Sequence, residues 1–191
     1  MSRIITFSRY IQRADGSHRK QEHLPTYFVE QILNSFGVDY VSEDYYQNLL
    51  LLNTENIVNR KLSWHDIESF YESLNASIFL GNKLHTIRSP KKPFKVGDKF
   101  TPAIWMGKPY CSPQIKFWDD IEVKQTWDIL LNTDIEDGWI NSECFGFPKY
   151  YDSKIELLAK NDGLSKIDFL NWFGKNEFKG NVICWDSNLK Y

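Results

Sequence analysis

The strongest constraint on the fold is a change in the pattern of apolar residues near Gly81. Before it, YFVEQILNSF has apolar residues at helical spacing, and residues from about 37 to 75 have a mostly helical pattern. After it, glycine and proline separate short β-prone runs, namely KLHTIR, KFTPAIWM and IEVKQTWDILL. These runs are too closely spaced for helical crossovers, so they predict a mainly antiparallel sheet.

The two ends of the chain complete an α+β pattern. IITFSRY predicts an opening strand and NVICW a buried closing strand. Between the sheet and the last strand, DSKIELLAKNDG predicts a helix with Ser153 and Glu156 as a capping box and Gly163 as its C-terminal stop. SKIDFLNWF predicts a second helix, capped by Ser165. We therefore expect a small curved sheet or barrel with flanking helices.

Composition restricts the class of protein. The 191 residues are 42% hydrophobic and 16% aromatic, which fits one folded domain over residues 1–191 and excludes disorder as the main state. No apolar run approaches the roughly 20 residues of a membrane span, and the first residues do not resemble a signal peptide. Three widely spaced cysteines predict free, buried thiols in a reducing cytoplasm. No motif for a metal or cofactor occurs in the sequence.

The charge is small overall but locally basic. The net charge is −2, which disfavours a protein that coats nucleic acid by bulk attraction. From Lys83 to Lys99, six Lys or Arg residues face one acid, Asp98. Such a strip suits a small anionic or nucleotide-sized partner better than a long duplex. On charge alone, a solvated lysine-rich loop is the simpler interpretation.

The segment from 78 to 100, IFLGNKLHTIRSPKKPFKVGDKF, carries most of the candidate chemistry. Strand alternation places Thr86 and Arg88 on one face and His85 on the other, so Lys83 reaches Thr86 only from the turn at Gly81, before the pleat begins. FKVGD predicts a second turn into a strand that pairs with the first. We expect residues 84–88 and 98–105 in one barrel, closed by residues 181–185.

GNKLHTIR followed by FKVGDKF resembles the signature of ASCH domains, which belong to the PUA-like superfamily. ITFSRY at the start, and NDGLSKIDFLNWF with NVICW at the end, are similar to other parts of that family. The W-x-G-K-P-Y segment resembles its phage and prophage members. The resemblance implies a PUA-like β-barrel whose cleft receives a nucleobase or nucleoside, with the mostly helical stretch at about 37–75 as an insertion.

One branch of ASCH proteins consists of amidohydrolases that deacylate N4-acetylcytidine with a lysine, a threonine and a glutamate. The resemblance matches Lys83 and Thr86 to the first two, and it places Asp162, one methylene shorter, at the glutamate. Thr86 would attack the amide carbonyl, Lys83 would take its proton, and Asp162 would shuttle the proton or hold Lys83. Arg88 would bind a carbonyl or phosphate oxygen.

Each of these residues also has a purely structural interpretation. Thr86 suits a strand by propensity, and Lys83 beside a turn is commonly a solvated charge. Arg88 equally fits a structural ion pair, and Asp162 before Gly163 fits a turn. His85 is expected to pack or to form a hydrogen bond rather than to act in catalysis. We expect Lys83, Thr86, Arg88 and Asp162 to converge on one concave site if they are functional.

A second group lies in TPAIWMGKPYCSPQIKFW. Trp105 and Tyr110 offer surfaces for stacking a base, and Lys108 and Ser112 offer donors to phosphate or sugar. A β-hairpin with core aromatic residues is the alternative, and we prefer it for Trp118. Arg9, with Arg13 and two histidines, predicts a basic lip near the lysine-rich strip.

Two functions of different classes follow. The first is an ASCH-like module that binds RNA or a modified nucleoside without catalysis. The second is a small amidohydrolase acting on an N4-acylated cytidine through Lys83, Thr86 and Asp162. A third possibility is a phage-encoded regulator that binds a host protein through the inserted helices. The shorter acid at position 162 and the insertion favour binding over catalysis.

Overall fold

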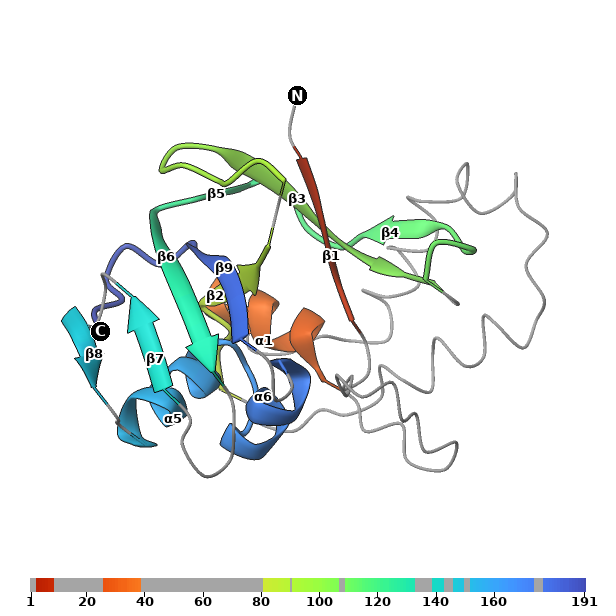
Figure 1. The fold of residues 1–191 in the computed structure, drawn as a ribbon. Helices are drawn as coiled ribbons and strands as arrows, with labels where there is room; N and C mark the ends of the chain where they lie inside the picture. The colour runs from red at the N-terminus through yellow and green to blue at the C-terminus, as the bar shows by residue number, and fades with distance from the viewer. Residues whose placement is uncertain are drawn as a thin grey trace.

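The computed structural model describes residues 3–8, 26–38, 81–89, 91–106, 109–132, 139–142, 146–149, 152–173 and 177–191. Over these ranges the chain is an α+β protein with two sheets and three helices, as the residue pattern predicts (Figure 1). No closed barrel forms within these ranges. Apart from Gly37 and Val38, the predicted insertion at about 37–75 lies outside the described residues.

The first sheet contains β1 (Arg3–Phe7), β3 (Lys99–Trp105), β4 (Gln114–Lys116) and β5 (Ile121–Glu122). β1 runs parallel to β3 with Phe7 opposite Ile104, and both β4 and β5 pair antiparallel with the other edge of β3. β3 and β4 form the expected hairpin. Its four strands therefore centre on β3, whose residues are buried from Phe100 to Ile104.

The second sheet has the order β2-β9-β6-β7-β8 and is antiparallel throughout. It contains β2 (His85–Arg88), β6 (Gln125–Asn132), β7 (Trp139–Ser142), β8 (Gly146–Lys149) and β9 (Glu177–Cys184). β9 is longer than the predicted NVICW strand, and it is flanked by β2 and β6 in register. β9 thus lies inside the sheet, and its residues Val182 and Ile183, which point to opposite faces, are both fully buried.

The predicted pairing of the strands at 84–88 and 98–105 is wrong. β2 pairs with β9 in one sheet, whereas β3 belongs to the other sheet, because β1 and the β4–β5 segments occupy both edges of β3. IEVKQTWDILL is likewise two strands rather than one. Val123 N donates to Asp98 O and Lys124 N to Cys184 O, so the chain crosses from the first sheet to the second at this point.

Within the described residues, three helices accompany the sheets: α1 (Phe28–Ser35), α5 (Asp152–Asn161) and α6 (Lys166–Phe173). The predicted Ser165 cap of α6 is confirmed, because Ser165 Oγ accepts a hydrogen bond from Asp168 N at 3.1 Å. Ser153 lies inside α5 rather than before it, since that helix begins at Asp152. None of the described helices has the length and apolar character needed to cross a membrane.

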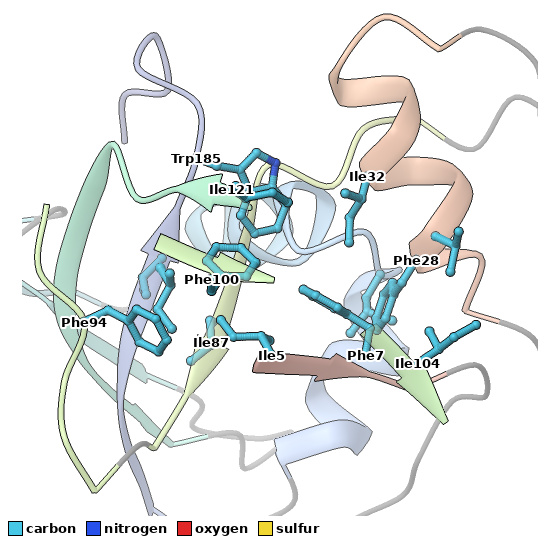
Figure 2. Packing of buried hydrophobic residues seen from close by; sticks show 14 of the residues in the cluster. Ile5, Phe7, Phe28, Ile32, Ile87, Phe94, Phe100, Ile104, Ile121 and Trp185 are labelled. Carbon is cyan, nitrogen blue, oxygen red and sulfur yellow. The ribbon is translucent and has the colours of Figure 1, made fainter. Parts of the chain in front are cut away.

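The core joins both sheets to α1 through aromatic rings. Phe7 of β1 packs edge-on against Phe28 of α1, with ring centroids 6.4 Å apart, and against Trp185, which follows β9, at the same distance. Trp185 in turn contacts Phe100 of β3. Figure 2 shows Phe7 next to Phe28 and Phe100 near Trp185, within one continuous apolar cluster. The two sheets are therefore one packing unit.

The thiols differ from the expectation in one respect. Cys184 is buried at the end of β9, but Cys111 is exposed because it lies in the turn that joins β3 to β4. Both are free, and Cys144 lies outside the described residues.

The C-terminus of α5 depends on Gly163, as predicted. Gly163 has φ +76°, Gly163 N donates to Lys160 O, and Leu164 N donates to Ala159 O, which is the hydrogen-bond pattern of a Schellman motif. A Cβ at Gly163 would also lie 2.0 Å from Gln31 Oε1 and 3.3 Å from Lys83 Cβ. Only glycine satisfies both the backbone conformation and this close approach.

We expect Gly163→Ala to destabilise the protein more than a matched change at Gly97. Gly97 has φ +86° but open space around its Cα, so Gly97→Ala adds only backbone strain of about 1–3 kcal/mol. Gly163→Ala adds the displacement of Gln31, so its loss of unfolding free energy should exceed that of Gly97→Ala by about 1 kcal/mol or more. Urea denaturation of both variants measures this difference. Equal losses would contradict the proposed crowding at Gly163.

Candidate functional site

Lys83 enters the site from a segment held between two helices. Its backbone N donates to Gln31 O of α1, and Leu84 N donates to Asn161 O at the end of α5. β2 begins only at His85, so Lys83 lies before the pleat, which is the position that an approach to Thr86 would require. Gly81 itself has φ +71°. The position of Lys83 is therefore set by α1 and α5 rather than by strand alternation.

The Lys83 side chain forms a buried ion pair. It is 1% exposed, and Lys83 Nζ donates to Asp162 Oδ1 at 2.6 Å and to the backbone carbonyl oxygen of Asp162. The ammonium also lies 3.9 Å from the centre of the Phe28 ring, which provides a favourable cation–π contact. The interpretation of Lys83 as a solvated charge is therefore wrong.

Asp162 is placed by the end of α5. Its backbone N donates to Leu158 O at 3.0 Å, and the Schellman motif at Gly163 fixes the direction of its carbonyl group. The last carbonyls of a helix carry partial negative charge, which favours a cation at this end. Asp162 thus offers Lys83 a carboxylate and a helix-terminal carbonyl from one residue. Its structural interpretation as a simple turn residue is incomplete, because the side chain is buried and paired.

Burial and pairing have opposite effects on the pKa values of Lys83 and Asp162. Burial lowers the pKa of Lys83 to about 8, while Asp162 opposes this change. Burial raises the pKa of Asp162, and the charge of Lys83 opposes it. Burial therefore moves the pKa of each group toward loss of its charge, and the ion pair with the other group opposes that change.

His85 lies on the side of β2 that faces Asp162 and remains neutral. Burial, followed by the charge of Lys83, lowers the pKa of His85 well below its ordinary value. His85 Nε2 lies 3.2 Å from Leu158 O, and since a carbonyl only accepts, Nε2 carries the proton. The lone pair of Nδ1 is 4.0 Å from Asp162 Oδ1, too far for a hydrogen bond. His85 packs and forms a hydrogen bond, as expected.

Arg88 links the end of β2 to the first sheet. Arg88 Nη2 donates to Thr6 O of β1 at 2.8 Å, and the guanidinium carbon lies 5.4 Å from the centre of the Phe7 ring. Burial lowers the pKa of Arg88, and both Asp162 and Tyr110 oppose that change. Arg88 is therefore within electrostatic reach of both groups, but it forms no ion pair within the described part of the chain.

Thr86 is buried and lies on the face of β2 that carries Arg88. In strand alternation this is the face opposite to His85. The Lys83 ammonium donates two hydrogen bonds to Asp162, and neither involves Thr86. The structure thus joins Lys83 to Asp162 and brings Arg88 near, but it does not couple Thr86 to Lys83 by a hydrogen bond.

The second predicted group lies at the β3–β4 turn. The rings of Trp105 and Tyr110 are 5.3 Å apart and tilted, and Tyr110 is 87% exposed with φ 63°. Ser112 is buried. Trp118 stacks on Phe36 at 5.6 Å, which agrees with its predicted packing role. Lys108 and Arg9 lie outside the described residues, so the predicted lip and phosphate donor at these positions stay predictions.

The basic strip divides into two parts. Lys83 and Arg88 point into the protein, whereas Lys91, Lys92, Lys95 and Lys99 are exposed. Asp98 is held at 2.7 Å by Arg3, and the hydrogen bond from Lys95 N is the main reason that its pKa is low. No three His, Cys, Asp or Glu side chains gather as metal ligands in the ranges that the structure covers.

Three residues of the site were not predicted from the sequence. The rings of Phe7 and Phe28 lie near the Lys83 ammonium, but the position of these residues in the sequence indicates only that they belong to the core. Asn181 is a buried polar residue on β9, next to Arg88 in register. A signal for it exists, since asparagine is unfavourable in strands and opens the otherwise apolar run NVICW.

The chain matches no protein-family model, no curated protein and no solved structure.

We expect Asp162→Asn to destabilise the protein by about 3–5 kcal/mol, because it leaves the Lys83 ammonium buried without a negative partner. The double variant Lys83→Met/Asp162→Asn removes that stranded charge and should be more stable than Asp162→Asn alone. Denaturant unfolding of both variants tests this order.

The exposed pair Lys124–Glu122, at 2.9 Å, is the matched control. Glu122→Ala should cost no more than about 1 kcal/mol, since solvent screens that pair. If Asp162→Asn were as mild as Glu122→Ala, the buried pair would not be a determinant of stability.

Proposed function

We propose that this chain is an ASCH-like, PUA-like module that binds RNA or a modified nucleoside beside β2. The observation that carries the proposal is the partly buried Arg88 at the end of β2, which lies within electrostatic reach of the buried pair between Lys83 and Asp162. Two cations with one carboxylate leave an excess of positive charge. Such a site favours electron-rich oxygens, which carbonyl groups of bases and phosphates both supply.

An exposed aromatic surface within electrostatic range of Arg88 supports a base-containing ligand. The exposed ring of Tyr110 contacts Trp105, and Tyr110 is close enough to influence the pKa of Arg88. Unstacked bases are commonly bound between aromatic rings and arginine. The resemblance of GNKLHTIR and FKVGDKF to ASCH domains points to the same class of ligand.

The proposed test is titration of the protein with cytidine, cytidine monophosphate and a short RNA. Arg88→Ala should weaken binding by about 1–3 kcal/mol through the loss of charge-assisted hydrogen bonds. A site for one nucleotide neutralises few phosphates, so the salt dependence should be shallow. Lys95→Ala, a change of an exposed lysine in the same basic strip, is the control and should have little effect on nucleoside binding.

Arg88 also holds β1, so the thermal unfolding of Arg88→Ala must be measured beside its affinity. Absence of binding to all three ligands by the folded wild-type protein would overturn the proposal. A steep salt dependence of binding, together with a large loss of affinity in Lys95→Ala, would indicate that the ligand binds at the exposed lysines and not at Arg88.

One observation favours the second candidate, an amidohydrolase. A buried lysine with a pKa of about 8 is suited to act as a general base near neutral pH. Lys83 would take the proton of Thr86 Oγ1 as that oxygen attacks the amide carbonyl. However, Asp162 holds the ammonium, so this route requires Lys83 to release Asp162 and to turn to Thr86.

We therefore expect N4-acetylcytidine to be bound without fast hydrolysis. The measurement is release of acetate by the wild-type protein and by Thr86→Ala across pH 6 to 10. Hydrolysis that disappears in Thr86→Ala and rises with pH through about 8, as Lys83 loses its proton, would establish the amidohydrolase instead.

A further inference from the structure

Three neighbouring strands carry a row of polar side chains on the face of Arg88. Arg88 of β2 is opposite Asn181 of β9, and Asn181 is opposite Asp128 of β6. Residues directly opposite each other in antiparallel strands point to the same face, with Cβ atoms about 5 Å apart. The contact between Asn181 Nδ2 and Asp128 Oδ1, at 3.4 Å, confirms this for the second pair.

The orientation of the Asn181 amide is fixed by its neighbours. Asn181 Nδ2 donates to Trp127 O and to Asp128 Oδ1, and both of these atoms can only accept. Asn181 Oδ1 must therefore be the atom that points away from them. Although Asn181 is only 5% exposed, Oδ1 has no hydrogen-bond partner among the described residues. A buried acceptor of this kind is costly and calls for an explanation.

Arg88 has a buried hydrogen-bond donor that also lacks a partner among the described residues. Its Nη2 is used by Thr6 O, but its Nε is buried and has no partner within the described part of the chain. Thr126 Oγ1 of β6 is a third such atom on this face, since Thr126 is opposite Ile183, which is opposite Thr86. A donor and an acceptor thus lie on adjacent strands and do not bond to each other.

We propose that Arg88 Nε and Asn181 Oδ1 together read one edge of a planar base, with Arg88 donating to a ring nitrogen or carbonyl and Asn181 accepting from an adjacent N–H. This inference rests on the proposed nucleoside-binding function and makes Asn181 its specificity-determining residue. The edge of cytosine, with N3 as acceptor beside the N4 amino group as donor, has the required pattern. Arg88 is only partly buried and Asp128 is exposed, so both ends of the row meet the surface, although Arg88 Nε and Asn181 Oδ1 themselves are buried in the unliganded protein.

The test combines a change in the ligand with a change in the protein. Cytidine and N4,N4-dimethylcytidine differ in the N–H that Asn181 is proposed to accept. Wild-type protein should bind cytidine roughly 5- to 100-fold more tightly than the dimethylated nucleoside, as expected when a buried acceptor loses its partner. Asn181→Leu should bind the two nucleosides with nearly equal affinity, because it lacks that acceptor.

Lys179→Ala is the matched control, since Lys179 is exposed and lies two residues before Asn181 on the same face of β9. It should keep the preference of the wild type for cytidine. If Asn181→Leu does not fold, Asn181→Ala makes the same comparison without added volume.

The outcomes separate this inference from the function on which it rests. Equal preference for cytidine in wild type and Asn181→Leu, with both binding, would overturn the role of Asn181 and leave nucleoside binding intact. In that case a bound water is the hydrogen-bond partner of Asn181 Oδ1, and Asn181 does not contact the base. Failure of the wild type to bind any nucleoside would overturn both proposals.

Discussion

The ion pair between Lys83 and Asp162 is the interaction on which the arrangement of the other elements depends. Residues 83 and 84 donate backbone hydrogen bonds to α1 and to α5, and the Lys83 side chain then binds the C-terminal end of α5. One short segment thereby fixes two helices relative to β2. Because both charges are buried, any movement that separates them leaves an unpaired charge in the protein interior, which resists displacement of either helix.

Arg88 and Phe7 extend this constraint to the first sheet. β1 is an edge strand whose Thr6 carbonyl is bound by Arg88 rather than by another strand. The ring of Phe7 lies near the cations of both Lys83 and Arg88, so the polar segment and the aromatic core meet at this residue. Trp185 adds a second link, since its Nε1 donates to Ser35 Oγ of α1 while its ring contacts Phe100. The position of Arg88 is thus set by both sheets.

Much of the local structure is predictable from the sequence, and the strand pairing is not. Periodicity and capping residues predict α1, α6 and the stop of α5 at Gly163, since these signals lie within a few residues of each element. The pairing of β2 with β9 joins residues almost 100 positions apart, and which edges are free depends on every other strand. For the same reason, the pattern of IEVKQTWDILL does not reveal that the chain changes sheets at Val123.

The candidate site is predictable to a similar extent. Lys83 and Asp162 are paired as the family resemblance implies, although neither periodicity nor charge connects two residues 79 positions apart. Asn181 was not predicted, because its importance depends on its register opposite Arg88 rather than on any motif.

The faces of β2 give the remaining reason to prefer recognition over catalysis. His85 and Ile87 lie on one face of β2, and Thr86, Arg88 and the neighbouring Asn181 lie on the other. Hydrolysis by Lys83 and Thr86 requires a lysine that is now committed to Asp162 to act on the Thr86 side. Binding through Arg88 and Asn181 requires no existing hydrogen bond of these two atoms to break, because the donor and the acceptor are both unused among the described residues and lie on adjacent strands of one face. A preorganised pair of this kind favours tight, selective binding, since little ordering remains to be done when the ligand arrives.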